Sequence, residues 1–168
     1  MSSRLGRKLA PLLGRRPGPG RLERIYLAPR AGAPMAASQA AQVLRGRGLA
    51  GDRYAEGRGF YRATDACQLT LIGAEALERI QARTGIALLG GEHRRNLVVR
   101  ALEPEALKGR RLRIGTVLFE YHRPRPPCGY LERLTAPGMV KALVRHPGVC
   151  LRALEDGLIR VGDPVVPD

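Results

Sequence analysis

Apolar residues fall in short runs along most of the chain, and these runs are separated by glycine, proline or charged residues. Residues 22–27 and 67–72 have the length and composition of β-strands. Residues 74–83 repeat apolar positions at helical spacing and predict a helix. Residues 38–45 predict a second, shorter helix that ends at the glycines after it. The polar segment 52–65 predicts a long loop.

The second half of the chain predicts more strand than helix. Strand patterns occur at 96–99, 111–114, 116–121, 158–161 and 165–166. A Gly-Asp turn at 162–163 predicts that the last two pair as a hairpin. Short helices are expected at 130–134 and 138–146. The run 123–129 contains three prolines, which remove donors and fix φ, so irregular structure is expected there.

These elements predict a mainly β, or α+β, chain with a β-barrel-like fold of about seven strands and a few flanking short helices. Strands and helices do not alternate regularly along the chain, so a parallel α/β sheet is not expected. Residues 1–21 contain six basic and no acidic residues and end in a Pro-Gly-Pro-Gly run. We interpret 1–21 as a flexible basic arm and 22–168 as one domain.

The formal net charge of +14 comes from 29 Lys and Arg against 15 Asp and Glu, and only three of the basic residues are lysines. This balance favours anionic partners. Trp is absent and aromatic residues make up 4% of the chain, which argues against stacking platforms for nucleic acid. No run approaches 18 apolar residues, so no membrane-spanning helix is expected.

Common catalytic and cofactor motifs are missing or incomplete. The chain has no HExxH and no CxxC, and its serines occur only at positions 2, 3 and 38. The run 46–51 spells G-x-G-x-x-G, but no strand pattern precedes it, so a glycine-rich turn is the better interpretation. His93, His122 and His146 are scattered and lack the spacing of zinc ligands.

Cys128 is the best candidate for a reactive group. Its loop is stiffened by Pro126 and Pro127, and Arg123 and Arg125 lie close in sequence; positive neighbours favour the thiolate form. Cys67 and Cys150 lie in apolar surroundings and are expected to be small buried side chains. Three cysteines without a secretory signal indicate a reducing cytosol, and therefore a cytoplasmic protein.

A second candidate cluster is the run 92–96 (Glu-His-Arg-Arg-Asn), which leads into a strand. Two guanidinium groups and an amide at the start of a strand suit a phosphate or a polar heterocycle. A solvated loop explains the same residues equally well.

Taken together, six blocks in order resemble the MOSC domain, the C-terminal module of molybdenum-cofactor sulfurases, and most of all its short stand-alone bacterial members. The blocks are Gly48–Tyr54, Gln68–Ile72 with Glu75–Leu77, Arg94–Val99, Leu107–Gly115, Pro127–Glu132 and Gly157–Asp163. The resemblance runs from about residue 22 to 167 and excludes the arm.

The resemblance implies a β-rich barrel and a functional cysteine, here Cys128, which carries sulfur or ligates molybdenum. It implies that Arg94, Arg95 and Asn96 hold the pterin and its phosphate, that Asp52 and Arg53 border the site, and that Gln68 and Thr70 add hydrogen bonds. A soft thiolate suits a redox metal. The expected cofactor is molybdenum cofactor (molybdopterin), and no pyridoxal phosphate site is expected in 168 residues.

Three functions remain open at this point. The first is a small molybdenum-dependent oxidoreductase acting on N-hydroxylated or N-oxide compounds, with an electron-donor protein as partner. The second is a persulfide carrier loaded at Cys128 by a separate cysteine desulfurase, with no resident metal. The third is a non-catalytic anion or nucleic-acid binder, although nucleic acid is disfavoured. A homodimer would give the cofactor additional cover, and no membrane partner is expected.

Overall fold

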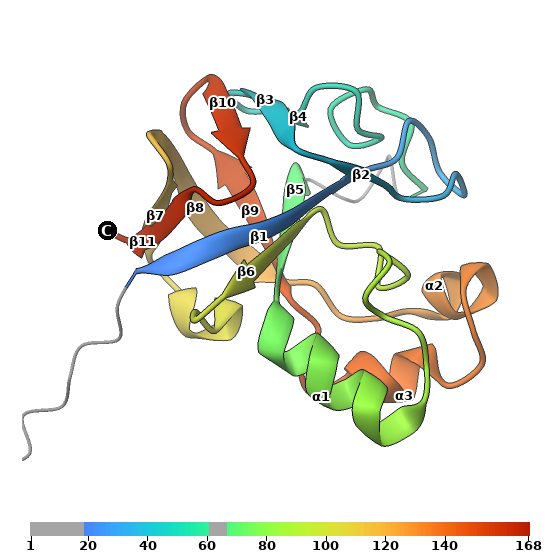
Figure 1. The fold of residues 1–168 in the computed structure, drawn as a ribbon. Coiled ribbons are helices and arrows are strands. Elements are labelled where there is room, and N and C mark those ends of the chain that lie inside the picture. Colours follow the sequence, from blue (N-terminus) through green and yellow to red (C-terminus); the bar gives the residue numbers. More distant parts are fainter. Residues whose placement is uncertain (1–18, 61–66) are drawn as a thin grey trace, which may run out of the picture.

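The computed structural model describes residues 19–60 and 67–168. Seven strands close into a barrel: β1 (Gly20–Leu27), β5 (Leu69–Gly73), β6 (Leu97–Arg100), β7 (Arg111–Ile114), β8 (Val117–Pro124), β9 (Val149–Ala153) and β11 (Pro164–Pro167). Their order is β11-β7-β8-β9-β5-β6-β1, and pairing of β1 with β11 closes the ring (Figure 1). β5 and β6 run parallel, and the other barrel pairs are antiparallel. The predicted barrel-like, mainly β fold is therefore confirmed.

The barrel closes because each strand turns its apolar positions toward one interior. In β7, Leu112 and Ile114 are buried while the two arginines are exposed, which is the alternation expected of a half-buried strand. Phe119 on β8 is the largest fully buried side chain of this core. Closure also leaves few unpaired strand edges.

A second, smaller sheet lies on the barrel and corrects one prediction. It contains β3 (Ala40–Leu44), β4 (Gly48–Leu49) and β10 (Gly157–Arg160), while β2 (Ala36–Ser38) extends the main sheet beside β1. The helix predicted over 38–45 is wrong. Ala41 and Val43 are buried and Gln42 is exposed, a period of two, and β10 supplies the hydrogen-bonding partner.

The predicted C-terminal hairpin is also wrong. β10 pairs with β3, whereas β11 pairs with β7 and β1. The turn at Gly162 and Asp163 instead connects β10, in the smaller sheet, with β11, in the barrel. A strand pattern shows which residues are extended, but it does not show which strand will pair with them.

The strand β9 was missed, and β8 runs further than expected, into the proline-rich segment. Pro124 lies opposite Val149 at the end of the β8–β9 ladder, where its missing N–H is tolerated. The main-chain N–H of Arg125 then donates to the carbonyl of Gly148. The irregular segment therefore begins at Arg125 and ends where α2 begins at Gly129.

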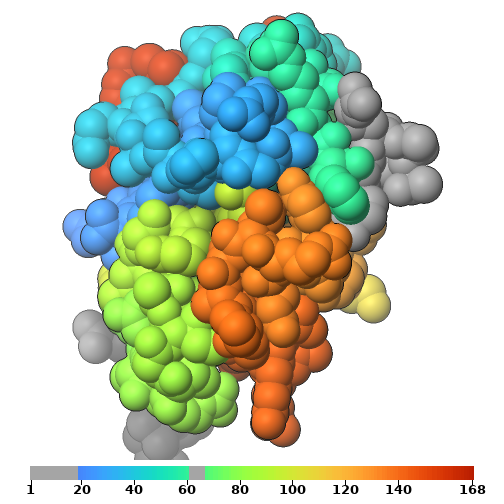
Figure 2. Space-filling model, turned by 90° about the vertical axis from the view of Figure 1, so that its right-hand side faces the viewer, coloured from blue at the N-terminus to red at the C-terminus, as the bar shows by residue number. Residues whose placement is uncertain are grey.

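Short helices cover one end of the barrel, as predicted. They are α1 (Ala74–Thr84), α2 (Gly129–Leu134), α3 (Met139–Leu143) and the 3₁₀ turn η1 (Pro104–Leu107). Figure 1 shows α1, α2 and α3 together on one side of the barrel. A second apolar cluster, which includes Ile72, Leu77 and Leu143, joins them to the strands. Figure 2 shows the face where the segment between β1 and Phe60 lies above α1 and the α2–α3 segment.

The predicted arm lies outside the described residues up to residue 18. Gly20 and Arg21, which were assigned to it, belong to β1 and pair with Val165 and Pro164. In the described part of the chain, every helix is too short or too polar to cross a bilayer.

At Gly48, β4 of the smaller sheet passes close to the main chain of Gln68, directly before β5. A Cβ at this position would lie 2.1 Å from the Gln68 carbonyl oxygen, and φ is +118°. We expect Gly48→Ala to lower the free energy of unfolding by more than about 3 kcal/mol, measured by urea denaturation. Gly46 also has a positive φ, of +70°, but open space around it. Gly46→Ala is the matched control and should cost about 1 kcal/mol. Equal losses in the two variants would contradict this packing.

Candidate functional site

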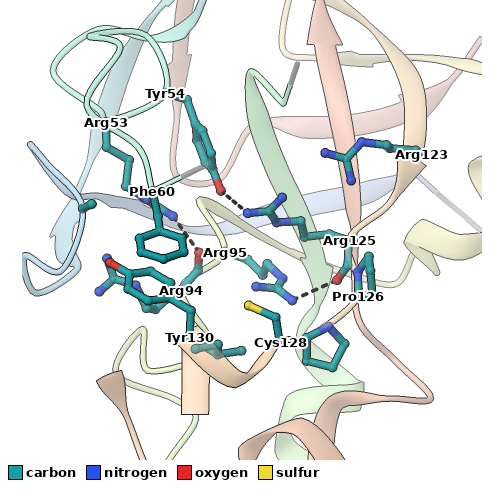
Figure 3. Close-up of a pocket in the computed structure, with 13 residues that line it drawn as sticks. Arg53, Tyr54, Phe60, Arg94, Arg95, Arg123, Arg125, Pro126, Cys128 and Tyr130 are labelled. Carbon is teal, nitrogen blue, oxygen red and sulfur yellow. Dashed lines mark hydrogen bonds between the residues drawn. The ribbon is translucent and has the colours of Figure 1, made fainter. Parts of the chain in front are cut away.

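A cavity of about 390 Å³ lies between the segment that follows β4 and the segment that joins β8 to α2. Every charged side chain among the described residues that line it is an arginine. The lining residues are Ala31, Arg53, Tyr54, Phe60, Arg94, Arg95, Arg123, Arg125, Pro126, Pro127, Cys128, Tyr130 and Leu131. Its described lining therefore combines strong positive charge with the thiol of Cys128 and the rings of Tyr54, Phe60 and Tyr130 (Figure 3).

Cys128 lies at the point where the proline-rich segment turns into α2. Its backbone is extended, with φ −137° and ψ 166°, and its side chain is half-buried. In Figure 3 the sulfur points toward the guanidinium group of Arg95. A nearby positive charge favours the thiolate, which is the nucleophilic and metal-binding form of cysteine.

The buried side chain of Arg95 holds in place the segment 125–128. It is only 4% exposed. Its Nε donates to the main-chain carbonyl of Pro147 at 2.9 Å. Its Nη1 donates to the main-chain carbonyl of His93 at 3.1 Å, and its Nη2 to that of Arg125 at 3.0 Å. Burial, and then the charge of Arg125, lower the pKa of Arg95 to about 10, so it stays protonated at neutral pH. Its donors thus join three separate segments.

Arg94 and Arg53 form the opposite wall. Arg94 has a left-handed backbone with φ 58°, and its Nη1 donates to the Ala33 carbonyl at 2.7 Å. Arg53 donates from Nη2 to the Arg94 carbonyl at 3.1 Å and from Nη1 to Asp52 Oδ1 at 3.1 Å. Burial, and then the charge of Arg53, lower the pKa of Arg94 from its ordinary value.

Tyr54 separates two of the arginines. Its hydroxyl accepts a hydrogen bond from Arg125 Nη2 at 3.0 Å, and the Arg53 guanidinium lies 4.5 Å from its ring centroid. Burial raises the pKa of Tyr54, so the hydroxyl stays neutral. At the mouth, the rings of Phe60 and Tyr130 stack with centroids 3.8 Å apart. The aromatic groups fix the arginines without neutralising them.

The structure brings half of the predicted site residues together. Cys128, Arg53, Arg94 and Arg95 all line the cavity. Asp52 is fully buried behind the wall, where it accepts hydrogen bonds from the main-chain N–H groups of Ala28 and Tyr54. Asp52 Oδ1 also accepts a hydrogen bond from Arg53 Nη1 and so positions Arg53 in the cavity wall.

The other three predicted residues hold the strands beneath the cavity and do not line it. Asn96 Oδ1 accepts from the N–H and hydroxyl of Thr70, and its Nδ2 donates to the Tyr26 carbonyl. Gln68 Oε1 accepts from the N–H of Ala153. Their direct contact with a ligand stays a prediction.

Nine of the described lining residues were not named as site residues from the sequence, and five of these nine are charged or aromatic. Arg123 and Arg125 entered only as neighbours of Cys128, although both line the cavity. Tyr54, Phe60 and Tyr130 were missed as well. Tyr54 and Tyr130 lie in blocks that carry the resemblance, so those blocks held a signal for them. Nothing local marks Phe60, because it meets Tyr130 only in the folded chain.

His93 supports the turn that carries Arg94 and Arg95. It is fully buried, and its Nδ1 accepts from the N–H of Arg95 at 2.9 Å. Burial, and then the charge of Arg95, lower its pKa from 6.5 to about 3. It is therefore neutral at physiological pH and is a structural histidine.

The arrangement can bind an anion and present a sulfur to it. The arginines attract phosphate, carboxylate or oxyanion groups, and a thiolate can attack an electrophile or ligate a soft metal. In the described parts of the chain, no three His, Cys, Asp or Glu side chains gather as a metal-binding set.

Comparison with known proteins gives one family. The family model described as MOSC domain matches residues 59–166. YuaD from Bacillus subtilis has a similar structure, with a TM-score of 0.72 and 17% identity over 88% of this chain and 94% of that one. YiiM from Geobacillus stearothermophilus has a TM-score of 0.69 and 18% identity over 89% and 75%. YiiM from Escherichia coli has a TM-score of 0.61 and 15% identity over 90% and 69%. No curated protein sequence matches the chain.

The neutral His93 makes a testable contribution to stability. Its pKa is lower in the folded chain than the ordinary 6.5, so the unfolded chain binds the extra proton and stability falls as the pH drops below about 6.5. Between pH 7.5 and 5.0 this group should remove about 2 kcal/mol from the free energy of unfolding. His93→Asn keeps a side-chain acceptor for the Arg95 N–H without titrating.

We therefore expect urea unfolding to show a smaller loss between these pH values in His93→Asn than in the wild type. The variant is less stable at pH 7.5 because it lacks the buried ring. An identical pH dependence in both proteins would show that His93 is not buried in its neutral form.

Proposed function

The chain belongs to the MOSC domain family, and on that basis we propose that it binds a molybdenum cofactor in the arginine-lined cavity, with the Cys128 thiolate as the protein ligand of the metal. The observation that carries the proposal is the placement of Cys128. Its sulfur faces a cavity whose charged lining residues, among those described, are all arginines. We further propose that the bound cofactor reduces N-hydroxylated or N-oxide compounds.

The residues of the cavity suit such a group. A thiolate is a soft ligand that suits a redox-active transition metal. Guanidinium groups suit the phosphate of a pterin cofactor, because their planar donors match oxyanion geometry. The volume of about 390 Å³ falls in the range of ordinary ligand sites.

Each wall would have a separate task. Arg95 holds the segment that carries Cys128 through the carbonyl of Arg125, and so keeps the sulfur aimed into the cavity. Arg53, Arg94 and Arg125 attract the anionic part of the cofactor. The stacked rings of Phe60 and Tyr130 limit access of water at the mouth. We expect the substrate to enter between these rings and Cys128.

The reduction is a two-electron step. When bound, the cofactor supplies two electrons that, with two protons, convert an N-hydroxyl compound to the amine and water. A separate redox protein must return the electrons, and we propose that it works with this chain in the cytoplasm. Among the described lining residues, the tyrosine hydroxyls are the groups placed to pass protons, and Tyr54 stays neutral because burial raises its pKa.

The same geometry favours one second function, a persulfide carrier. A half-buried thiol beside several guanidinium groups is an activated nucleophile. In that case Cys128 attacks the persulfide of a cysteine desulfurase, takes its outer sulfur and releases the desulfurase thiolate. No metal would then be resident.

Metal content separates these functions. The chain is purified anaerobically from cells that make molybdenum cofactor, and molybdenum and pterin are measured per protein. We expect near-stoichiometric amounts in the wild type and at least a tenfold loss in Cys128→Ser, because a hydroxyl is a poor ligand for a soft metal. Arg83→Gln is the matched control: Arg83 is exposed at the end of α1, and its loss should change nothing.

Full molybdenum content in a folded Cys128→Ser variant would overturn the assignment of the metal ligand. A wild type without molybdenum that gains one sulfur at Cys128 from a desulfurase and cysteine would establish the carrier instead. Circular dichroism of each variant shows that the chain is folded.

A further inference from the structure

Two cysteines outside the cavity lie against each other. The Cys67 and Cys150 sulfurs are 2.8 Å apart, although 83 positions separate them in the chain. Cys67 is 5% exposed and Cys150 is fully buried. They were predicted to be small buried side chains, and their burial is confirmed. Their contact with each other was not foreseen.

The pair does not belong to the apolar core of the barrel. Val149 and Leu151 on β9 point into that core, so Cys150 between them points to the outer side of the barrel wall. Its partner across the ladder, Thr70, lies between two other core residues on β5. Neither cysteine is part of either apolar cluster. The two thiols therefore meet at a buried position outside both apolar clusters.

The sulfur pair lies close to the cavity walls. Cys150 and Cys67 oppose the lowering of the pKa of Arg95, and Cys67 adds to the raising of the pKa of Tyr54. On β8, Arg123 lies directly opposite Cys150. Two residues before Cys150, the Gly148 carbonyl accepts from the N–H of Arg125. The strand that carries Cys150 is thus tied to the segment that leads to Cys128.

We propose that Cys67 and Cys150 are a redox-modification site, in which oxidation by a peroxide joins them in a disulfide that links the start of β5 to β9 next to the arginine-lined cavity. The sulfurs need to approach by less than about 1 Å to reach bonding distance. This proposal is independent of any bound cofactor, because it concerns thiols that do not line the cavity.

The chemistry balances with one peroxide. One thiolate attacks the peroxide oxygen and becomes a sulfenic acid, and the other oxygen leaves as water after taking up a proton. The second thiol then attacks the sulfenic sulfur, forms the S–S bond and releases another water. The two sulfurs together lose two electrons and two protons, and hydrogen peroxide is reduced to two molecules of water. A small-molecule dithiol reverses the reaction.

The disulfide would make the wall behind the cavity more rigid. It closes a long loop that contains β5, α1, β6 and the whole of β8. Such a crosslink restricts the unfolded chain and raises stability when the native geometry already suits it. We therefore expect the oxidised protein to have a higher Tm, by roughly 5–10 °C. We also expect slower amide exchange at Arg123 and Arg125.

The test uses the Cys128→Ser protein, in which Cys67 and Cys150 are the two remaining cysteines, so that no crosslink to residue 128 can form. The folded protein is treated with hydrogen peroxide, the remaining thiols are alkylated, and peptides are mapped by mass spectrometry before and after dithiothreitol. We expect a Cys67–Cys150 crosslink in most molecules, a Tm raised by several degrees and full reversal on reduction. Wild-type protein treated in parallel should give the same crosslink in preference to any that includes Cys128.

Two results would overturn the proposal. One is the absence of the crosslink after oxidation under conditions that keep the chain folded, with sulfinic acid or unmodified thiols instead. The other is a crosslink whose formation lowers the Tm, because the folded geometry would then not suit the bond. Cys67→Ser in the Cys128→Ser background is the matched control and should show neither crosslink nor Tm shift. If that control does not fold, the first two proteins still decide the question.

Discussion

The buried guanidinium of Arg95 is the interaction on which the cavity depends. A buried cation is costly unless its donors find partners, and each of the three Arg95 nitrogens donates to a carbonyl, of Pro147, His93 and Arg125. Main-chain carbonyls hold the group without cancelling its charge. One side chain thus fixes the segment that carries Cys128 and keeps positive charge beside the sulfur.

The rest of the site is built to keep several arginines close together despite their repulsion. Asp52 neutralises part of the charge of Arg53 from behind the wall, and Tyr54 lies between Arg53 and Arg125 with its ring and hydroxyl. Beneath the cavity, hydrogen bonds between Asn96 and Thr70 connect the start of β6 to β5. These buried polar contacts explain why the arginine wall is formed by the fold itself, before any ligand binds.

Much of the fold could be predicted from periodicity, but the pairing of its strands could not. The helix α1 and most barrel strands follow their apolar patterns closely. The run 40–44 was misread because four small or apolar residues around Gln42 fit a helix or a strand, and only β10 decides between them. The predicted C-terminal hairpin failed for a related reason, since β11 pairs with β1 and β7, which are both distant in sequence.

The site residues divide in the same way: some are marked by their neighbours in the sequence, and others come together only in the folded chain. Cys128 could be singled out because prolines and arginines surround it in sequence, and Arg94 and Arg95 because they precede a strand. Asn96 belongs to the same run, yet its side chain turns into the wall between β5 and β6, where it bonds with Thr70 and with the carbonyl of Tyr26. The Phe60–Tyr130 stack and the Cys67–Cys150 contact join residues about 70 or more positions apart, beyond the reach of any local pattern.

The most direct test of the central claim is the alkylation rate of Cys128 in cofactor-loaded and cofactor-free protein, followed by mass spectrometry with iodoacetamide. The buried Cys67 and Cys150 serve as internal references in the same sample. If the Cys128 thiolate ligates the metal of a molybdenum cofactor, loading should slow its alkylation at least tenfold and leave the references unchanged. Equal rates with and without the cofactor would show that the sulfur does not bind it.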